Sequence, residues 1–242
     1  MASKLLCVLT LLSATASTYA DGIQGGIATS ITTHPYYVSI QYSSGIHICG
    51  GALISPDIVI TSASCVANNV VSELYARVGS NKYASDGQEI PIAAYTFDRS
   101  CDFVTNEYDV GLFKLAKPIK ASSTVGIIEV ASSKPVTGTS GVVIGWNTNE
   151  DLVEVPVDII SSSDCASGPF RYNEDDLFDS HVCGLAESSE ACGGESGSPL
   201  VSNNQLVGLV SWGYACSNKG NPAIYTNIAA VKSWIASASN TL

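Results

Sequence analysis

The sequence predicts an all-β domain of the barrel or sandwich kind that ends in one α-helix. Its 242 residues include 21 Gly and 9 Pro but a single Met, a composition typical of turn-rich β proteins. Short runs of alternating apolar and polar residues are separated by turn signals roughly every ten residues, which is the spacing of a barrel or sandwich. The last apolar residues instead have the spacing of an amphipathic helix.

Individual elements follow from this alternation. Residues 38–42 and 155–159 alternate apolar and polar side chains, and residues 206–209 do so less regularly. Ser55-Pro56-Asp57 predicts a turn between two apolar runs, as in a hairpin. The terminal helix is predicted over about 229–240 from four apolar residues with helical spacing: Ile228, Val231, Trp234 and Ile235.

The first twenty residues are predicted to be a secretory signal peptide. Lys4 precedes an apolar run over residues 5–12 that is too short to span a bilayer, and small residues lead to a cut after Ala20 or Ala16. A buried core helix is the alternative, which the position and the flanks disfavour. We therefore expect a signal peptide over 1–20, a short propeptide over 21–22 and a secreted, extracellular domain over 23–242.

The charge balance excludes a general nucleic-acid binder. The chain carries 22 acidic and 11 basic side chains, and removal of Lys4 with the signal peptide makes the mature net charge −12. Such a chain has no excess of cations to neutralise a phosphate backbone. No later apolar segment has membrane-spanning length, so we expect neither nucleic acid nor membrane among the partners.

Because secretion is expected, the cysteines can be interpreted as candidates for disulfide bonds. Seven of the eight remain after the signal peptide is removed, so at least one thiol has no intrachain partner. Counting alone leaves every pairing open. No two cysteines have the close spacing of metal ligands, so we expect no metal site and no cofactor.

The segment 190–199, Glu-Ala-Cys-Gly-Gly-Glu-Ser-Gly-Ser-Pro, is the strongest candidate for chemistry. Glycines around Ser196 would allow a tight turn with an exposed hydroxyl, and the N–H groups of Gly194 and Ser196 could converge on an oxyanion. Taken alone, the segment is as easily a plain turn.

Further landmarks occur in a fixed order along the chain: Ile23-Gln-Gly-Gly26, His47-Ile-Cys-Gly-Gly51, Thr61-Ser-Ala-Ser-Cys65, Asp109-Val-Gly-Leu112, the Ser196 segment and Ser211-Trp-Gly213. Together they make the mature chain resemble the trypsin/chymotrypsin-like serine protease family (S1). The resemblance implies two six-stranded antiparallel β-barrels with a cleft between them and a C-terminal α-helix. With the best crossover at residues 117–123, the N-terminal barrel would span about 23–120 and the C-terminal barrel about 121–228.

The resemblance also implies a disulfide pattern: Cys49–Cys65, Cys165–Cys183 and Cys192–Cys216. Cys101 would then be the free thiol. For Cys101, burial as a small apolar residue and an intermolecular bridge are the two alternatives, of which burial is favoured.

The most consequential departure from the family pattern lies at the catalytic base. The base position lies in the segment Thr61-Ser-Ala-Ser-Cys65. Active members carry His just before the Cys of this segment, and here that position is Ser64. Asp109 matches the carboxylate that orients the base and Ser196 matches the nucleophile. A hydroxyl cannot act as a general base near neutral pH, so we expect no functional catalytic residue.

The histidines offer few substitutes for the missing base. Only three exist, and a structural role is favoured for His34 and His181. His47 is the one candidate for an unconventional base.

Two further departures concern activation and substrate binding. Ile23 follows Asp21-Gly22 instead of Lys or Arg, and Glu195 replaces the Asp that pairs with the freed Ile23 amine in active relatives. The substrate-pocket positions implied by the resemblance are Glu190, Ala191, Ser211, Trp212, Gly213, Ala215 and Ala223. Alanine where glycine is usual predicts a narrowed pocket.

We therefore interpret the chain as a secreted, proteolytically inactive homologue that acts by binding proteins. A weak hydrolase using Ser196 with His47 or substrate assistance is the alternative, and an inert storage protein has no support in the composition. The segment 210–220 resembles mite group 3 allergens and their scabies mite inactivated paralogues. That resemblance implies host plasma partners, namely complement components, through contacts on exposed loops.

Overall fold

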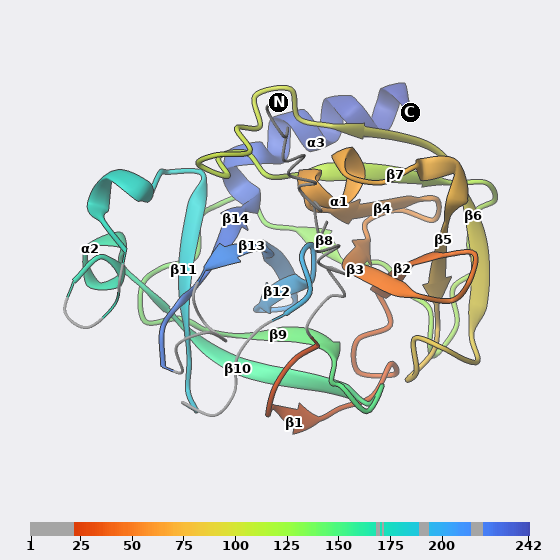
Figure 1. Cartoon of the computed structure of the whole chain (residues 1–242), viewed down its shortest axis with the longest axis horizontal. Helices are drawn as coiled ribbons and strands as arrows, with labels where there is room; N and C mark the ends of the chain where they lie inside the picture. The colour runs from red at the N-terminus through yellow and green to blue at the C-terminus, as the bar shows by residue number, and fades with distance from the viewer. Residues whose placement is uncertain (1–21, 168–169, 171, 189–193, 214–219) are drawn as a thin grey trace, which may run out of the picture.

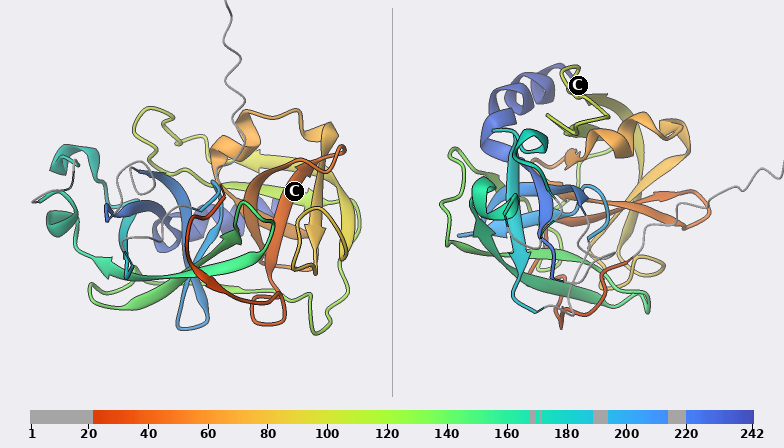
Figure 2. Two further views of the ribbon diagram at one scale, coloured as in Figure 1. Left: turned by 60° about the horizontal axis from the view of Figure 1, so that its bottom comes forward. Right: turned by 60° about the vertical axis from the view of Figure 1, so that its left-hand side comes forward.

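The computed structural model describes residues 22–167, 170, 172–188, 194–213 and 220–242 (Figure 1). Most of the described chain lies in two closed six-stranded antiparallel β-barrels, as the sequence predicts. Their strands occupy separate halves of the molecule, orange to yellow-green and green to blue, as the two further views in Figure 2 also show.

The first barrel closes in the order β2-β3-β4-β7-β6-β5. Its strands are β2 (Tyr37–Tyr42), β3 (His47–Leu53), β4 (Ile58–Thr61), β5 (Leu74–Val78), β6 (Gln88–Phe97) and β7 (Gly111–Leu115). Strand β2 is buried on both faces. Val38 and Ile40 fill the barrel interior, whereas Tyr37 belongs to the core between the barrels and Ser39 is buried on the same strand face as Tyr37.

The second barrel closes because β9 pairs with both β10 and β12. Its strands are β9 (Ser140–Trp146), β10 (Leu152–Ile160), β11 (His181–Ala186), β12 (Pro199–Ser202), β13 (Gln205–Gly213) and β14 (Ala223–Asn227). Strand β10 has the alternation that the sequence predicts: Val155, Val157 and Ile159 are buried and the residues between them are half-buried. A two-residue strand, β8 (Glu129–Val130), runs parallel to β13.

The segment that follows residue 22 lies on the second barrel, although we expected it within the N-terminal one. Strand β1 (Ile27–Ala28) pairs with β10, and Ile23 bridges to Asn147 and is buried in the core of the second barrel. The physical reason is burial: the Ile23 side chain finds its apolar neighbours there, and the chain reaches the first barrel only at β2.

Helix α3 (Ile228–Thr241) ends the chain and covers one side of both barrels (Figure 1). The side chain of Asn227 caps it by accepting a hydrogen bond from the Ala229 N–H. Its apolar face, which includes Val231 and Ile235, joins the core between the barrels. The remaining short elements are α1 (Ala63–Ala67), α2 (Ser162–Cys165) and the 3₁₀ turns Val71–Glu73 and Glu174–Asp176.

Two of the three implied disulfides lie within the described residues. Cys49–Cys65 joins β3 to α1, and Cys165–Cys183 joins α2 to β11, with Cα–Cα distances of 6.2 and 6.3 Å. Cys101 is a free thiol and is half-buried. The third implied pair, Cys192 and Cys216, lies outside the described residues.

Candidate functional site

The residues that match the catalytic triad come from both barrels. Ser64 lies on α1 of the first barrel, Asp109 precedes β7, and Ser196 lies just before β12 of the second barrel. The turn that carries Ser196 is held against the first barrel, because its carbonyl oxygen accepts a 3.0 Å hydrogen bond from the Gly50 N–H. Gly197, with φ of +80°, leaves no room for a Cβ, which would lie 2.1 Å from Thr61 Oγ1.

Asp109 is buried and fully oriented. Its Oδ2 accepts a 2.6 Å hydrogen bond from the Ser211 hydroxyl, and its Oδ1 accepts a 3.1 Å bond from the Ser64 N–H. Burial raises the pKa of Asp109 above its ordinary value, and the hydrogen bonds from Ser211 and Ser64 only partly offset that rise. Among the described residues, no basic side chain hydrogen-bonds to this carboxylate.

Ser64 occupies the base position without any basic group. Its hydroxyl oxygen lies 2.9 Å from that of Ser62, so the two hydroxyls bond to each other. A serine hydroxyl in this place cannot take the proton of Ser196 at neutral pH, because its conjugate acid is far too strong.

None of the three histidines of the chain hydrogen-bonds to Asp109 or Ser196. His34 contacts Glu154 and Tyr36. His181 contacts the Asn106 carbonyl and the Phe178 N–H. The charge interaction of His181 with Asp109 lowers the pKa of Asp109. The two ring nitrogens of His181 nevertheless bond to Asn106 and Phe178 and not to Asp109. The structural roles expected for His34 and His181 agree with these contacts.

His47, which we considered as an alternative base for Ser196, makes its contacts with other residues. Its Nδ1 lies 2.7 Å from Ser39 Oγ, and its Nε2 lies 3.6 Å from Glu195 Oε1. The side chain of Gln41 donates a 2.7 Å hydrogen bond to the same Ser39 oxygen.

Glu195 lies at the centre of this buried cluster. Its Oε2 accepts hydrogen bonds from the Tyr37 and Ser198 hydroxyls at 3.2 and 3.0 Å, and its Oε1 accepts one from the Trp146 N–H at 3.3 Å. Burial by itself raises the pKa of Glu195, but His47 and the hydrogen bonds outweigh burial and hold it below its ordinary value. The ring of His47 also stacks on Tyr83.

Ile23 and Glu195, the positions that the family resemblance pairs after activation, are not paired in this uncut chain. The nitrogen of Ile23 is an uncharged peptide N–H, and it donates to the Trp146 carbonyl at 2.9 Å. Glu195 Oε1 instead lies 3.6 Å from His47 Nε2. A pairing after cleavage before Ile23 stays a prediction.

The oxyanion positions retain free donors. Gly194 has φ of +144°, a conformation that favours glycine. Within the described part of the chain, nothing accepts a hydrogen bond from the N–H of Gly194 or of Ser196. Both groups could therefore still donate to an oxyanion.

Comparison with known proteins decides the family. The trypsin family model matches residues 23–235. The chain belongs to the trypsin family. Trypsin theta of Drosophila melanogaster is 40% identical over 91% of this chain and 87% of its own length. A trypsin of Sarcophaga bullata is 40% identical over 89% of this chain and 88% of its own, and trypsin iota of Drosophila melanogaster is 34% identical over 97% and 96%.

Within this trypsin-family fold, the positions that the sequence resemblance assigned to a substrate pocket are partly described. Gly213 and Ala223 are paired across β13 and β14, and a Cβ on Gly213 would lie 2.7 Å from Tyr172 Oη and 3.4 Å from Ala223 Cα. Trp212 packs edge-on against Tyr172 and His181. Glu190, Ala191 and Ala215 lie outside the described residues, so the narrowed pocket stays a prediction.

The described ranges contain no group of three or more side chains suited to hold a metal ion. They also contain no helix long and apolar enough to cross a membrane.

Proposed function

We propose that this trypsin-family chain does not carry out peptide hydrolysis and acts by binding other proteins. The observation that carries the proposal is the contact of Ser64 with Ser62 at the base position, while every histidine is bonded elsewhere. In subtilisin, loss of the histidine alone costs about a million-fold in turnover. The oxyanion hole and substrate binding preserve only about a thousand-fold over water there.

The Glu195 cluster supports the same proposal independently. In the uncut chain Glu195 contacts His47, Tyr37 and Ser198, and Glu195 and its three partners are all buried. A freed Ile23 amine would have to replace these contacts before it could pair with Glu195. The chain therefore lacks the base, and in its uncut form other residues already contact the Glu195 carboxylate.

A weak serine hydrolase is the second candidate. The hydrogen bonds of Asp109 and the free N–H groups of Gly194 and Ser196 favour it, because these parts of the hydrolytic machinery are in place. The relatives named above are also called trypsins.

Reaction with a fluorophosphonate probe and a panel of esters separates the two candidates. We expect neither stoichiometric labelling of the purified mature chain nor turnover, because nothing activates the Ser196 hydroxyl. Ser196→Ala is the matched control for nonspecific labelling. Stoichiometric labelling with turnover that Ser196→Ala abolishes would instead establish the weak hydrolase.

As binding partners we propose complement proteins of host plasma. This proposal takes the chain to be secreted. The resemblance to the inactivated mite paralogues supports this class, and the rigid double barrel supports binding through its exposed loops. Micromolar protein is expected to reduce haemolysis in a complement lysis assay. An active insect trypsin treated with inhibitor is the control. Unchanged haemolysis would exclude complement proteins as partners. That result would not contradict the proposal that the chain lacks catalysis.

A further inference from the structure

Ile23 is built into the second barrel in the uncut chain. Its N–H donates to the Trp146 carbonyl at 2.9 Å, and the residue is 1% exposed. Its side chain packs against Gly145, where an added Cβ would lie 2.8 Å from Ile23 Cδ1. Ile23 therefore has both a backbone partner and an apolar site before any cut frees its nitrogen.

Gly22 is the residue that lets the uncut chain reach this site. A Cβ at position 22 would lie 2.8 Å from the Trp146 carbonyl oxygen, 3.1 Å from the Asn147 carbonyl carbon and 3.3 Å from the Thr148 nitrogen. All three atoms belong to the backbone, which cannot move aside as the end of a long side chain can. A larger residue at position 22 would therefore displace either the N-terminal segment or the hairpin of β9 and β10.

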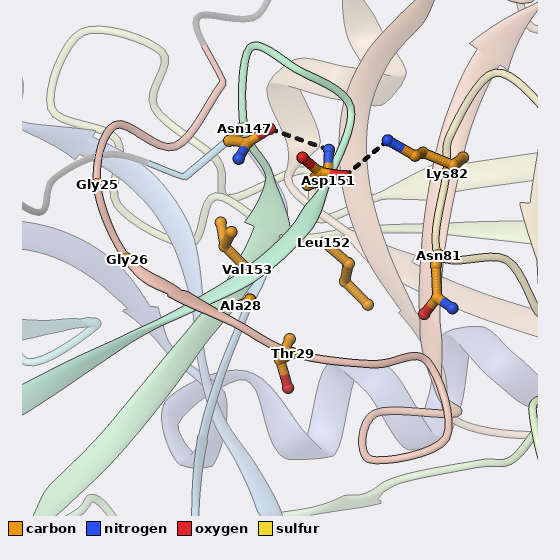
Figure 3. Close-up of a pocket in the computed structure, with 10 residues that line it drawn as sticks. All are labelled: Gly25, Gly26, Ala28, Thr29, Asn81, Lys82, Asn147, Asp151, Leu152 and Val153. Atoms are coloured by element: carbon orange, nitrogen blue, oxygen red, sulfur yellow. Dashed lines mark hydrogen bonds and ion pairs between the residues drawn. The ribbon is translucent and has the colours of Figure 1, made fainter.

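The hairpin of β9 and β10 that forms this site also contacts the first barrel. The Trp146 indole donates to the Asn81 carbonyl at 2.9 Å. An ion pair joins Lys82 Nζ to Asp151 Oδ1 at 2.6 Å (Figure 3). These contacts place the wall of the Ile23 site without any contribution from a freed amine.

The buried carboxylate beside this site has its partners within the uncut chain. A Cβ at Gly145 would lie 2.6 Å from Glu195 Oε2, so Glu195 and Ile23 both contact this glycine. Three hydrogen-bond donors and His47 already surround Glu195. Hydrogen bonds and a basic partner offset much of the cost of burying a carboxylate. The fold therefore does not need an amine from a cut chain to compensate this charge.

We propose that this protein reaches its working conformation without a cut before Ile23, and that Gly22 makes this possible. The inference goes beyond the proposed function, because it concerns how the fold is completed and holds whether or not Ser196 is active. The peptide bond before Ile23 is already packed against the hairpin of β9 and β10. Cleavage there would therefore add a charge but would not be needed to place the chain.

Amide hydrogen exchange measured by NMR tests the placement of Ile23 directly. In a chain that begins at Asp21, the Ile23 amide is expected to exchange at least about a hundred-fold more slowly than in an unfolded peptide. The reason is its burial and its hydrogen bond to the Trp146 carbonyl. Exchange at the rate of an unfolded peptide would overturn the proposal.

Gly22→Val is expected to lower the melting temperature of the same chain by about 5 °C, because the added side chain meets backbone atoms. It should also speed the exchange of the Ile23 amide at least about tenfold. Gly22→Ala, which adds only the clashing Cβ, should show both changes on a smaller scale and serves if Gly22→Val does not fold. Gln24→Val is the matched control, because Gln24 is exposed in the same segment, and it should change neither quantity. Gly22 variants that melt and exchange like the parent chain would overturn the proposal.

A chain that begins at Ile23 completes the test. It should melt within about 5 °C of the chain that begins at Asp21, because the site of Ile23 is filled in both. A larger rise in the melting temperature of the chain that begins at Ile23 would overturn the proposal, since the freed amine would then complete the fold. None of these measurements depends on Ser196, so their failure would leave the proposed function as it stands.

Discussion

Replacing Ser64 by histidine is expected to raise the hydrolysis of an activated ester by about a thousand-fold or more. The backbone already favours this rescue, because the Ser64 N–H lies 3.1 Å from Asp109 Oδ1 and Ser211 holds the other carboxylate oxygen. An imidazole at position 64 would therefore lie beside a carboxylate that is prepared to orient it. A small activated ester is the right substrate, because it depends little on the pocket that includes Ala223.

The controls for this experiment separate catalysis from a surface effect. Ser64→His combined with Ser196→Ala should return the rate to that of the parent chain, and Ser64→His combined with Asp109→Asn should lose most of the gain. A Ser64→His variant that folds but gains nothing would show that the missing base is not the main obstacle. The obstacle would then be the Glu195 cluster or the substrate pocket.

The barrels, the family and two disulfides could be predicted from the sequence, because each leaves a local or ordered signal. The alternation over residues 155–159 marks β10, and the helical spacing after residue 228 marks α3. The Ser64 substitution is visible because the neighbouring Cys65 fixes its position within the motif.

Pairings between distant segments left no such signal. A two-residue strand such as β1 has no pattern of its own, and only its burial against β10 decides which barrel it joins. His47 could be placed near the cleft but not oriented. Its side chain follows the face of β3 that meets Ser39, and this contact directs the ring to Glu195 instead of Ser196.

The orientation of His47 leads to the largest expected effect on stability. His47→Ala is expected to lower the free energy of unfolding at neutral pH by about 3 kcal/mol, because Glu195 would keep a buried charge without its nearest basic partner. The donors Tyr37, Ser198 and Trp146 would remain, so the loss should not prevent folding. Urea unfolding followed by circular dichroism measures it.

The pH dependence of this loss has a definite sign. In the parent chain the pKa of Glu195 is lowered in the folded state, so its contribution to stability is present above the ordinary value of 4.5 and disappears as the pH falls through the lower folded value. Without His47, two of the contributions that lower the pKa of Glu195 are lost, so we expect that pKa to rise and protonation to cost the folded state less. The difference between the parent chain and His47→Ala should therefore shrink on acidification.

Adding Glu195→Gln to His47→Ala is the matched control, since it removes the charge but keeps the size of the side chain. The double variant should recover part of the stability and should lose the pH-dependent difference, because no buried carboxylate remains to titrate. A deficit of His47→Ala that is equal at acidic and neutral pH, or that the second substitution leaves unchanged, would assign the effect to lost packing against Tyr83 and Trp146. In that case the buried charge of Glu195 would be stabilised mainly by the hydrogen bonds from Tyr37, Ser198 and Trp146.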